Sequence, residues 1–371
     1  MKRLFLLLIL VTALTFDSLA CTSAIVTAQR SSEGAPILWK HRDWTENTSC
    51  VKYFEVGKYT YTAVVSNKKR SKTVYAGINE KGFGIINTAT RNMRASSAEE
   101  YKACDRKMIK WSEMWHYALH NCATVNEYEE YLRDTKRTHK FGTNIAVADA
   151  SGAVAYFEIG DLYYHRYDAT DRKEGFDVRS NFSFAGIEEK RGPSTRRYDI
   201  IMREMLAHEG NFTPQQFITY SRSYNSCAYG DILATNDEYI CSNHAVPRAT
   251  TIGSFILVCD AKCPRMLVMT GHTVPSIAVP VYVQAKHNIP ECVKGSAMRL
   301  LSDDFIAKAY LKRGEKDRVL QKELVRKVLK IKQSKIVFPQ QMPTDIEAFN
   351  AKLDKQFAKH EKRVRKVLSK F

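Results

Sequence analysis

The sequence predicts a layered α+β fold. Segments typical of strands come first, helical segments follow, and another hairpin comes after them, an order that favours helices packed on sheets. The 371 residues are 44% apolar and 11% aromatic and contain no internal repeat or low-complexity tract. This is the composition of an ordinary globular protein that can bury a substantial core.

The first segments after residue 20 have the composition of strands. Thr22 to Ala28, Pro36 to Trp44 and Tyr59 to Ser66 are rich in β-branched and aromatic residues. Thr73 to Ala89 predicts a hairpin, because Asn79-Glu80-Lys81-Gly82 has the residue types of a tight turn. These strands form the first half of the predicted sheet structure.

Two helices and a second hairpin follow. Lys107 to Cys122 and Asn126 to Thr135 have helical patterns, and the first repeats Trp111, Met114, Trp115 and Leu119 at three- and four-residue intervals. Thr143 to Val147 and Ala153 to Ile159 flank the turn formers Asp149, Ser151 and Gly152. The chain thus returns from helices to strands.

Ser194 to Glu209 predicts another helix, and Thr213-Pro214 supplies a cap followed by proline at the first position of a helix through Tyr220. A third hairpin pairs Thr250 to Val258 with Arg265 to Thr270. The one plausible boundary lies near Pro290, so we expect a main domain over residues 21–290 and a helical extension over residues 291–371.

The extension is basic. Residues 301–371 contain 19 Lys and Arg against 9 Asp and Glu, which is much of the net charge of +17. Apolar residues recur there at helical spacing, as in Leu353, Phe357, Val364 and Leu368. We expect amphipathic helices packed on the main domain with a solvated basic face; attraction to an anionic surface or substrate is the alternative.

Residues 1–20 have the parts of a secretory signal peptide. Lys2 and Arg3 precede an apolar run from Leu4 to Leu14, and Ser18 and Ala20 are small residues at the positions that a signal peptidase recognises. The run is too short for a permanent membrane span, and no later stretch approaches that length. Cleavage after Ala20 would make Cys21 the first residue of a secreted or periplasmic protein.

Two other fates of Cys21 stay open. It could be a lipid anchor. A lipidation site, however, has an aliphatic residue three positions before the cysteine and a small one two positions before it, and Ser18 and Leu19 have the reverse order. It could also form a disulfide, but setting it aside leaves eight of nine cysteines, an even number that could pair fully without it. A lipid-anchored, non-catalytic surface protein is therefore the alternative to an enzyme.

A terminal cysteine can supply both a nucleophile and its base. The thiolate is the reactive form of a thiol whose ordinary pKa is about 8.5, and an α-amine of pKa about 7.7–8.0 can accept the thiol proton. Cleavage of an amide would further need donors for the developing oxyanion and a group that orients the amine. No histidine, metal or cofactor is required.

From about Cys21 to Val283 the motifs resemble those of the cysteine-type N-terminal-nucleophile hydrolases, which include penicillin V acylases, conjugated bile acid hydrolases and acyl-coenzyme A:6-aminopenicillanate acyltransferases. The resemblance rests on the order and spacing of these segments: Cys21-Thr22-Ser23, Lys40 to Trp44, Gly77 to Gly82, Asn144 to Glu158, Ser180-Asn181-Phe182 and Ser194 to Tyr198. It implies a four-layer αββα sandwich that cleaves linear amides.

The resemblance also implies roles for single residues. Cys21 would be nucleophile and base, Asp43 would contact and hold its amine, and Asn181 would donate to the oxyanion. Arg197, or Arg196 if the motif is aligned one residue earlier, would tune the thiol and form a forked pair with Asp43. The alternatives are a turn carboxylate for Asp43, a turn asparagine or glycosylated sequon for Asn181, and an exposed helix arginine for Arg197.

Substrate contacts are expected from Asn87 and Arg42. Several bile-acid-cleaving relatives have an arginine three residues before the aspartate, where this chain has Lys40, with Arg42 next to Asp43 instead. The segment Ile85 to Ala89 also lacks an aromatic residue that relatives often have. Both departures fall where selectivity would be set, so the resemblance does not imply bile acids as the substrate.

The sequence therefore predicts an exported amidohydrolase that forms a thioester on Cys21 and acts on a small N-acyl amide. Transfer of the acyl group to a second amine would use the same intermediate. Export makes a nucleic-acid partner improbable, and a homo-oligomer is compatible with the sequence.

Overall fold

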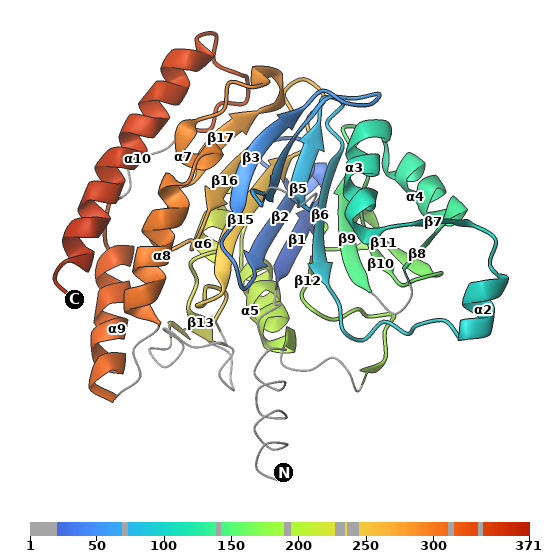
Figure 1. The fold of residues 1–371 in the computed structure, drawn as a ribbon, viewed down its shortest axis with the longest axis horizontal. Coiled ribbons are helices and arrows are strands. Elements are labelled where there is room, and N and C mark those ends of the chain that lie inside the picture. Colours follow the sequence, from blue (N-terminus) through green and yellow to red (C-terminus); the bar gives the residue numbers. More distant parts are fainter. Residues whose placement is uncertain are drawn as a thin grey trace.

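The computed structural model describes residues 21–68, 73–138, 142–188, 194–226, 234–235, 245–310, 315–332 and 337–371. Within them, two antiparallel sheets form the centre of the molecule (Figure 1). The predicted signal peptide, residues 1–20, lies outside the described residues.

The first sheet has the strand order β12-β1-β2-β15-β16-β17 and the second β11-β10-β9-β6-β5-β4-β3. The strands of the first sheet are β1 (Thr22–Val26), β2 (Ile37–Asp43), β12 (Phe176–Arg179), β15 (Thr251–Val258), β16 (Arg265–Thr270) and β17 (Val279–Tyr282). Those of the second are β3 (Ser49–Phe54), β4 (Tyr61–Ser66), β5 (Val74–Asn79), β6 (Gly84–Ala89), β9 (Thr143–Ala148), β10 (Val154–Ile159) and β11 (Tyr164–Asp168). Two small pairs complete the described strands: β7 (Lys107–Ile109) with β8 (Thr135–Arg137), and β13 (Asn225–Ser226) with β14 (Ala234–Thr235).

Helices cover both sheets. The described helices are α2 (Ala98–Ala103), α3 (Trp111–Asn121), α4 (Val125–Asp134), α5 (Thr195–Leu206), α6 (Pro214–Tyr220), α7 (Glu291–Lys294), α8 (Ala297–Ala309), α9 (Glu315–Leu329) and α10 (Ile346–Leu368). Helices α3 and α4 share a buried cluster with the outer face of the second sheet, and α5 and α6 share one with the outer face of the first. The four-layer αββα arrangement predicted from the sequence is confirmed.

A third cluster fills the space between the sheets. It joins Leu38 and Leu257 of the first sheet to Val64 and Ile86 of the second. Because side chains alternate along a strand, Leu38 points between the sheets while Trp39 packs on the helical side. The same alternation decides on which face each polar residue at the end of β2 lies.

The predicted hairpins and helices match the observed ones to within a few residues. In the β5–β6 turn, Asn79 Oδ1 accepts hydrogen bonds from the backbone N–H of Lys81 and Phe83, at 3.0 and 3.1 Å, and Gly82 has a φ of 78°. A positive φ favours glycine. At α6, Gln216 Oε1 accepts from the N–H of Thr213 at 2.7 Å, and Pro214 is the first helical residue.

Four strands of the two large sheets were not predicted: β3, β11, β12 and β17. The short strands β7, β8, β13 and β14 were not predicted either, and β7 occupies the first residues of the predicted helix Lys107 to Cys122, which begins instead at Trp111. Strands β11 and β12 contain charged residues, such as Arg166 and Arg179, that depart from an apolar pattern. In the fold, the Arg179 Nε and Nη1 atoms lie 2.7 Å from Glu158 and 2.8 Å from Asp177, so its charge is compensated inside the protein. Tertiary pairing thus permits a charged residue that local composition disfavours.

Helices α8, α9 and α10 lie side by side along one side of the sheets (Figure 1). Their apolar residues Leu301, Phe305, Leu353 and Phe357 belong to the same buried cluster as the core between the sheets. The basic residues Lys352, Lys355, Lys359, Lys362 and Lys366 of α10 are exposed. No helix in the described part of the chain is long and apolar enough to cross a membrane.

Candidate active site

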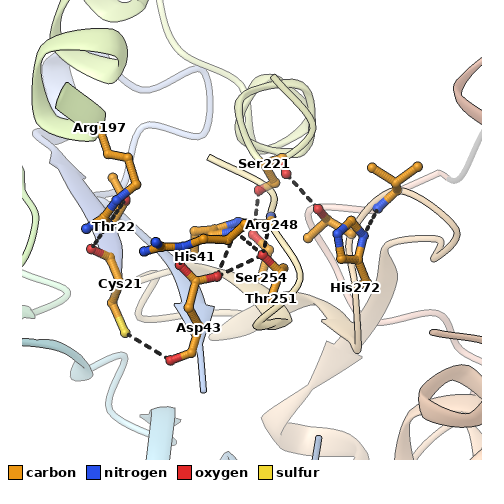
Figure 2. Close-up of polar contacts among 12 residues, drawn as sticks. Cys21, Thr22, His41, Asp43, Arg197, Ser221, Arg248, Thr251, Ser254 and His272 are labelled. Carbon is orange, nitrogen blue, oxygen red and sulfur yellow. Dashed lines mark hydrogen bonds and ion pairs between the residues drawn. The ribbon is translucent and has the colours of Figure 1, made fainter. Parts of the chain in front are cut away.

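Cys21 lies directly before β1, with its residue surface only 5% exposed. In the antiparallel register Thr22 is opposite His41, so Cys21 comes next to Arg42 at the end of the β1–β2 pair. The Sγ atom of Cys21 is 4.0 Å from the carbonyl oxygen of Asp43 (Figure 2). The candidate nucleophile is thus placed where β1 begins and β2 ends.

Asn181 and Arg197 hold the two backbone polar atoms of Cys21. The Cys21 nitrogen donates to Asn181 Oδ1 at 2.7 Å, and Arg197 Nη1 donates to the Cys21 carbonyl oxygen at 2.7 Å. Arg197 Nη2 donates to the same Asn181 oxygen at 2.9 Å, which links the two contacts. Residues that are 160 and 176 positions away in sequence therefore fix the position of Cys21.

Arg197 is buried, contrary to the alternative of an exposed helix arginine. Burial lowers its pKa to about 9, so the guanidinium remains charged near neutral pH. Its hydrogen bonds go to Cys21, Thr22 and Asn181, and the expected forked pair with Asp43 is not among them. The reason is that another arginine occupies that position beside the carboxylate.

Arg248 is the arginine that pairs with Asp43. Its Nε atom donates to Asp43 Oδ2 at 2.8 Å, and Thr251 Oγ1 donates to Asp43 Oδ1 at 2.8 Å (Figure 2). The expected hydrogen bond between this carboxylate and the Cys21 nitrogen is not formed. The carboxylate lies on the face of β2 toward Arg248 and Thr251, whereas the nitrogen donates to Asn181.

The surroundings of Asp43 keep it ionised. Burial alone would raise the pKa of its carboxyl group, but Arg248, a hydrogen bond with His41 and the charge of Arg197 lower it well below the ordinary value. His41 Nε2 lies 3.5 Å from Asp43 Oδ1 and 3.1 Å from Thr251 Oγ1. Asp43 is therefore a fixed negative charge between two arginines.

Asn87 and Lys40 lie on the inter-sheet side of the site. Lys40 Nζ donates to both the backbone oxygen and Oδ1 of Asn87. Burial lowers the pKa of Lys40 to about 7, the Cys21 thiolate opposes this change, and the Arg42 charge adds to it. Lys40 was not predicted as a site residue, although its position three residues before Asp43 was noted as a departure.

A cavity of about 160 Å³ opens beside Cys21. Its lining includes Arg42, Asp43 and Asn87 together with the apolar surfaces of Trp44, Val74, Ala89 and Trp115. Both residues expected to contact substrate, Asn87 and Arg42, therefore lie at this cavity. Asn181 and Arg197 contact the backbone atoms of Cys21 and are not among the lining residues.

The sequence did not indicate Arg248 or Thr251. The available signal was their position at the start of a predicted strand: Thr251 is the second residue of Thr250 to Val258, and Arg248 stands two residues before it. Their role appears only when that strand pairs with β2, with a register shift between Thr251 and Gly253 that brings Thr251 opposite Asp43. Bulges of this kind redirect side chains at functional sites.

The seven cysteines in the described residues are free thiols, so Cys21 forms no disulfide there. Cys259 and Cys263 of the third hairpin are buried and unbonded. In the same part of the chain, no three His, Cys, Asp or Glu side chains gather as a metal-binding group.

The sequence matches no protein-family model and shows no significant similarity to a curated protein. Similar solved structures include a variant of conjugated bile acid hydrolase from Clostridium perfringens, with 9% identity and a TM-score of 0.45 over 74% of this chain and 94% of that one. Penicillin V acylase from Agrobacterium tumefaciens matches with 13% identity and a TM-score of 0.44, over 71% and 86%. An N-acylethanolamine-hydrolyzing acid amidase ortholog from Caenorhabditis elegans matches with 18% identity and a TM-score of 0.41, over 64% and 93%.

These matches include two kinds of enzyme that the sequence motifs resemble. At such identities and TM-scores, they assign no activity or substrate to this chain.

Proposed function

We propose that this protein is an amide hydrolase whose nucleophile is the thiol of Cys21, exposed as the first residue by cleavage after Ala20. The observation that supports this most is that Cys21 lines a small cavity while a buried hydrogen bond holds its nitrogen in place. The nitrogen donates to Asn181 at 2.7 Å, and the cavity of about 160 Å³ borders Cys21 itself. A substrate carbonyl in this cavity would meet the thiol.

The proposed reaction has two stages. The free α-amine of Cys21 takes the thiol proton, and the sulfur forms a bond to the acyl carbon of the amide. The resulting ammonium returns the proton to the nitrogen of the substrate, so the amine leaves and a thioester remains. Water then loses a proton to the α-amine, attacks the thioester carbon and releases the acid and the thiol.

Arg197 and Asn181 would keep the α-amine next to the sulfur. Asn181 Oδ1 accepts one hydrogen of the nitrogen, and Arg197 fixes the carbonyl end of the same residue. Asn181 Nδ2 donates one hydrogen to the Ala89 carbonyl oxygen at 2.8 Å, and an amide has a second one. We assign that second hydrogen, together with the Asn87 side-chain amide, to the developing oxyanion.

Asp43 would act through its charge and not by contact with the amine. Its carboxylate pairs with Arg248 and offsets part of the charge of Arg197, which reduces the net positive charge of this buried group of residues. Export, with a periplasmic or extracellular location, is part of the same proposal, because it provides the cleavage that frees Cys21.

The first experiment is mass analysis of the mature protein with and without iodoacetamide. We expect a chain that begins at Cys21 and gains one alkyl group there, with loss of activity toward a panel of N-acyl amides. Cys21→Ala should fold with unchanged circular dichroism and show no turnover, and Cys263→Ala, which changes another buried thiol, should remain active. An active Cys21→Ala variant, a different N-terminus or a diacylglyceryl group on Cys21 would refute the proposal.

A further inference from the structure

Arg42 is a buried cation that has no anionic or hydrogen-bonding partner in the described structure. Its residue surface is 6% exposed, and its Nε atom is enclosed without an acceptor. The guanidinium lies 3.8 Å from the ring centre of Tyr75 and 5.0 Å from that of Trp44. Aromatic stacking therefore holds the group in place, but no carboxylate of the described residues neutralises it.

Other buried arginines in the described part of the chain have ion-pair or hydrogen-bond partners, although Arg179, Arg248 and Arg265 each keep one enclosed nitrogen without an acceptor. Arg248 pairs with Asp43 at 2.8 Å, Arg179 pairs with Glu158 and Asp177, and Arg265 pairs with Glu33. Arg197 donates to carbonyl, hydroxyl and amide oxygens around Cys21. Arg42 differs from these four arginines, because its guanidinium makes no ion pair or hydrogen bond within the described residues.

An unpaired buried charge is expensive. Desolvation of a cation costs more free energy than cation–π stacking returns. A site that keeps such a charge commonly uses it for a ligand, because an incoming anion recovers the lost solvation. A guanidinium that is stacked on rings keeps its N–H edge available for a carboxylate.

The cavity determines where that ligand would lie. Arg42 lines the same space of about 160 Å³ as Cys21, and the β1–β2 register makes the two residues neighbours across the strands. Asp43 does not neutralise Arg42, because its carboxylate is bound to Arg248 and Thr251. Lys40 donates to Asn87 and is not among the lining residues of the cavity.

We propose that Arg42 binds a carboxylate of the substrate, so that the amide cleaved at Cys21 carries a negative charge a few bonds from its carbonyl group. This inference rests on the proposed function, and it adds the substrate class. Trp44, Val74, Ala89 and Trp115 supply an apolar wall for the remaining atoms of a small molecule. The carboxylate could belong to the leaving amine, as in an N-acyl amino acid, or to the acyl group, as in the monoamide of a dicarboxylic acid.

Matched substrates test this assignment. N-butyrylglycine is compared with neutral N-butyrylglycinamide for a carboxylate on the amine side, and N-methylsuccinamate with N-methylbutyramide for one on the acyl side. We expect a higher kcat/KM for the anionic member of one pair. In Arg42→Gln that preference should fall about 100-fold while the neutral substrate changes less than about threefold, as expected for removal of a buried charged contact. Arg42→Lys should recover part of it.

Arg203→Gln, which changes an exposed arginine of α5, is the matched control and should leave both rates unchanged. A thermal melt of each variant separates loss of the contact from loss of the fold. The inference is overturned if wild type and folded Arg42→Gln prefer the anionic substrate to the same extent. It is also overturned if wild type prefers the neutral member of both pairs.

A binding measurement keeps the inference testable if the enzyme cleaves none of these amides. Cys21→Ala is titrated with N-butyrylglycine, N-methylsuccinamate and their neutral counterparts, and saturation-transfer NMR reports binding without turnover. We expect anionic ligands to bind at least tenfold more tightly, and Arg42→Gln in the same background to abolish the difference. No difference between charged and neutral ligands would refute the role of Arg42, whereas binding without any turnover in wild type would instead count against the proposed hydrolase activity.

Discussion

At the scale of single residues, Lys40 makes folding stability depend on pH. Its pKa falls from 10.5 to about 7 because the ammonium is buried, and the shift corresponds to about 5 kcal/mol. Between pH 7 and 10.5 the unfolded chain binds this proton and the folded chain does not. The free energy of unfolding therefore rises with pH across this range, and the full penalty is present below pH 7.

Lys40→Met removes this penalty. We expect the variant to gain stability over wild type at pH 6 and to lose about 2–3 kcal/mol of that advantage by pH 9, measured by urea unfolding at both values. Lys81→Met, at an exposed lysine, is the control and should show no such pH dependence. A Lys40→Met advantage that is the same at both pH values would show that the lysine is not neutral in the folded protein at pH 9.

Lys40 also allows a test on the thiol. Its cation stabilises the Cys21 thiolate, and this effect disappears as the lysine loses its proton. The rate of Cys21 alkylation in the wild type should therefore show an inflection near pH 7. In Lys40→Arg, whose charge does not titrate, and in Lys40→Met, this inflection should be absent; its persistence in both variants would assign it to another group.

The residues that the motifs indicated lie together around Cys21, but not all of their expected contacts are formed. Cys21, Asn181 and Arg197 come together through buried hydrogen bonds. The partner of Asp43 could not be predicted, because two arginines compete for one carboxylate and only the fold decides which of them reaches it. The unpaired state of Arg42 was equally hidden, since a sequence does not show which charges lack partners.

At the scale of elements, the irregularity in β15 completes the site. The register between β15 and β2 shifts between Thr251 and Gly253, and Thr251 is brought opposite Asp43. Thr251 Oγ1 donates to Asp43 and accepts the backbone N–H of Arg248 at 3.0 Å. The hairpin containing β15 was predicted, but its pairing with β2 joins residues about 200 positions apart, which local patterns do not encode.

Thr251→Val tests this link, since it keeps the shape and removes the hydroxyl group. The Asp43 carboxylate would lose a donor and the Arg248 amide its acceptor, which should cost about 1–3 kcal/mol of stability in urea unfolding. Amide cleavage should fall as well. Thr251→Ser keeps the hydroxyl and should retain most of both properties; a stable, fully active Thr251→Val would show that the link is dispensable.

At the scale of the whole molecule, the C-terminal helices share the core of the sandwich. Their amphipathic pattern was predicted from sequence, including the exposed lysines of α10. The sequence could not show which surface they cover, because an apolar stripe fits any apolar face. In the fold, α7 contacts β3 of one sheet and β16 of the other, so the helices span the side of the sandwich.

This arrangement predicts that α10 unfolds together with the sheets. Phe357 is 3% exposed within the cluster between the sheets, so Phe357→Ala should lower the free energy of unfolding by about 3–5 kcal/mol. Lys359→Ala, at an exposed position of the same helix, should change it by less than about 0.5 kcal/mol. Circular dichroism and tryptophan fluorescence should report one coincident transition in both variants, because the buried contacts of α10 are continuous with those of the strands. Two separate transitions, with the first shifted by Phe357→Ala, would show that the helices form an independent unit.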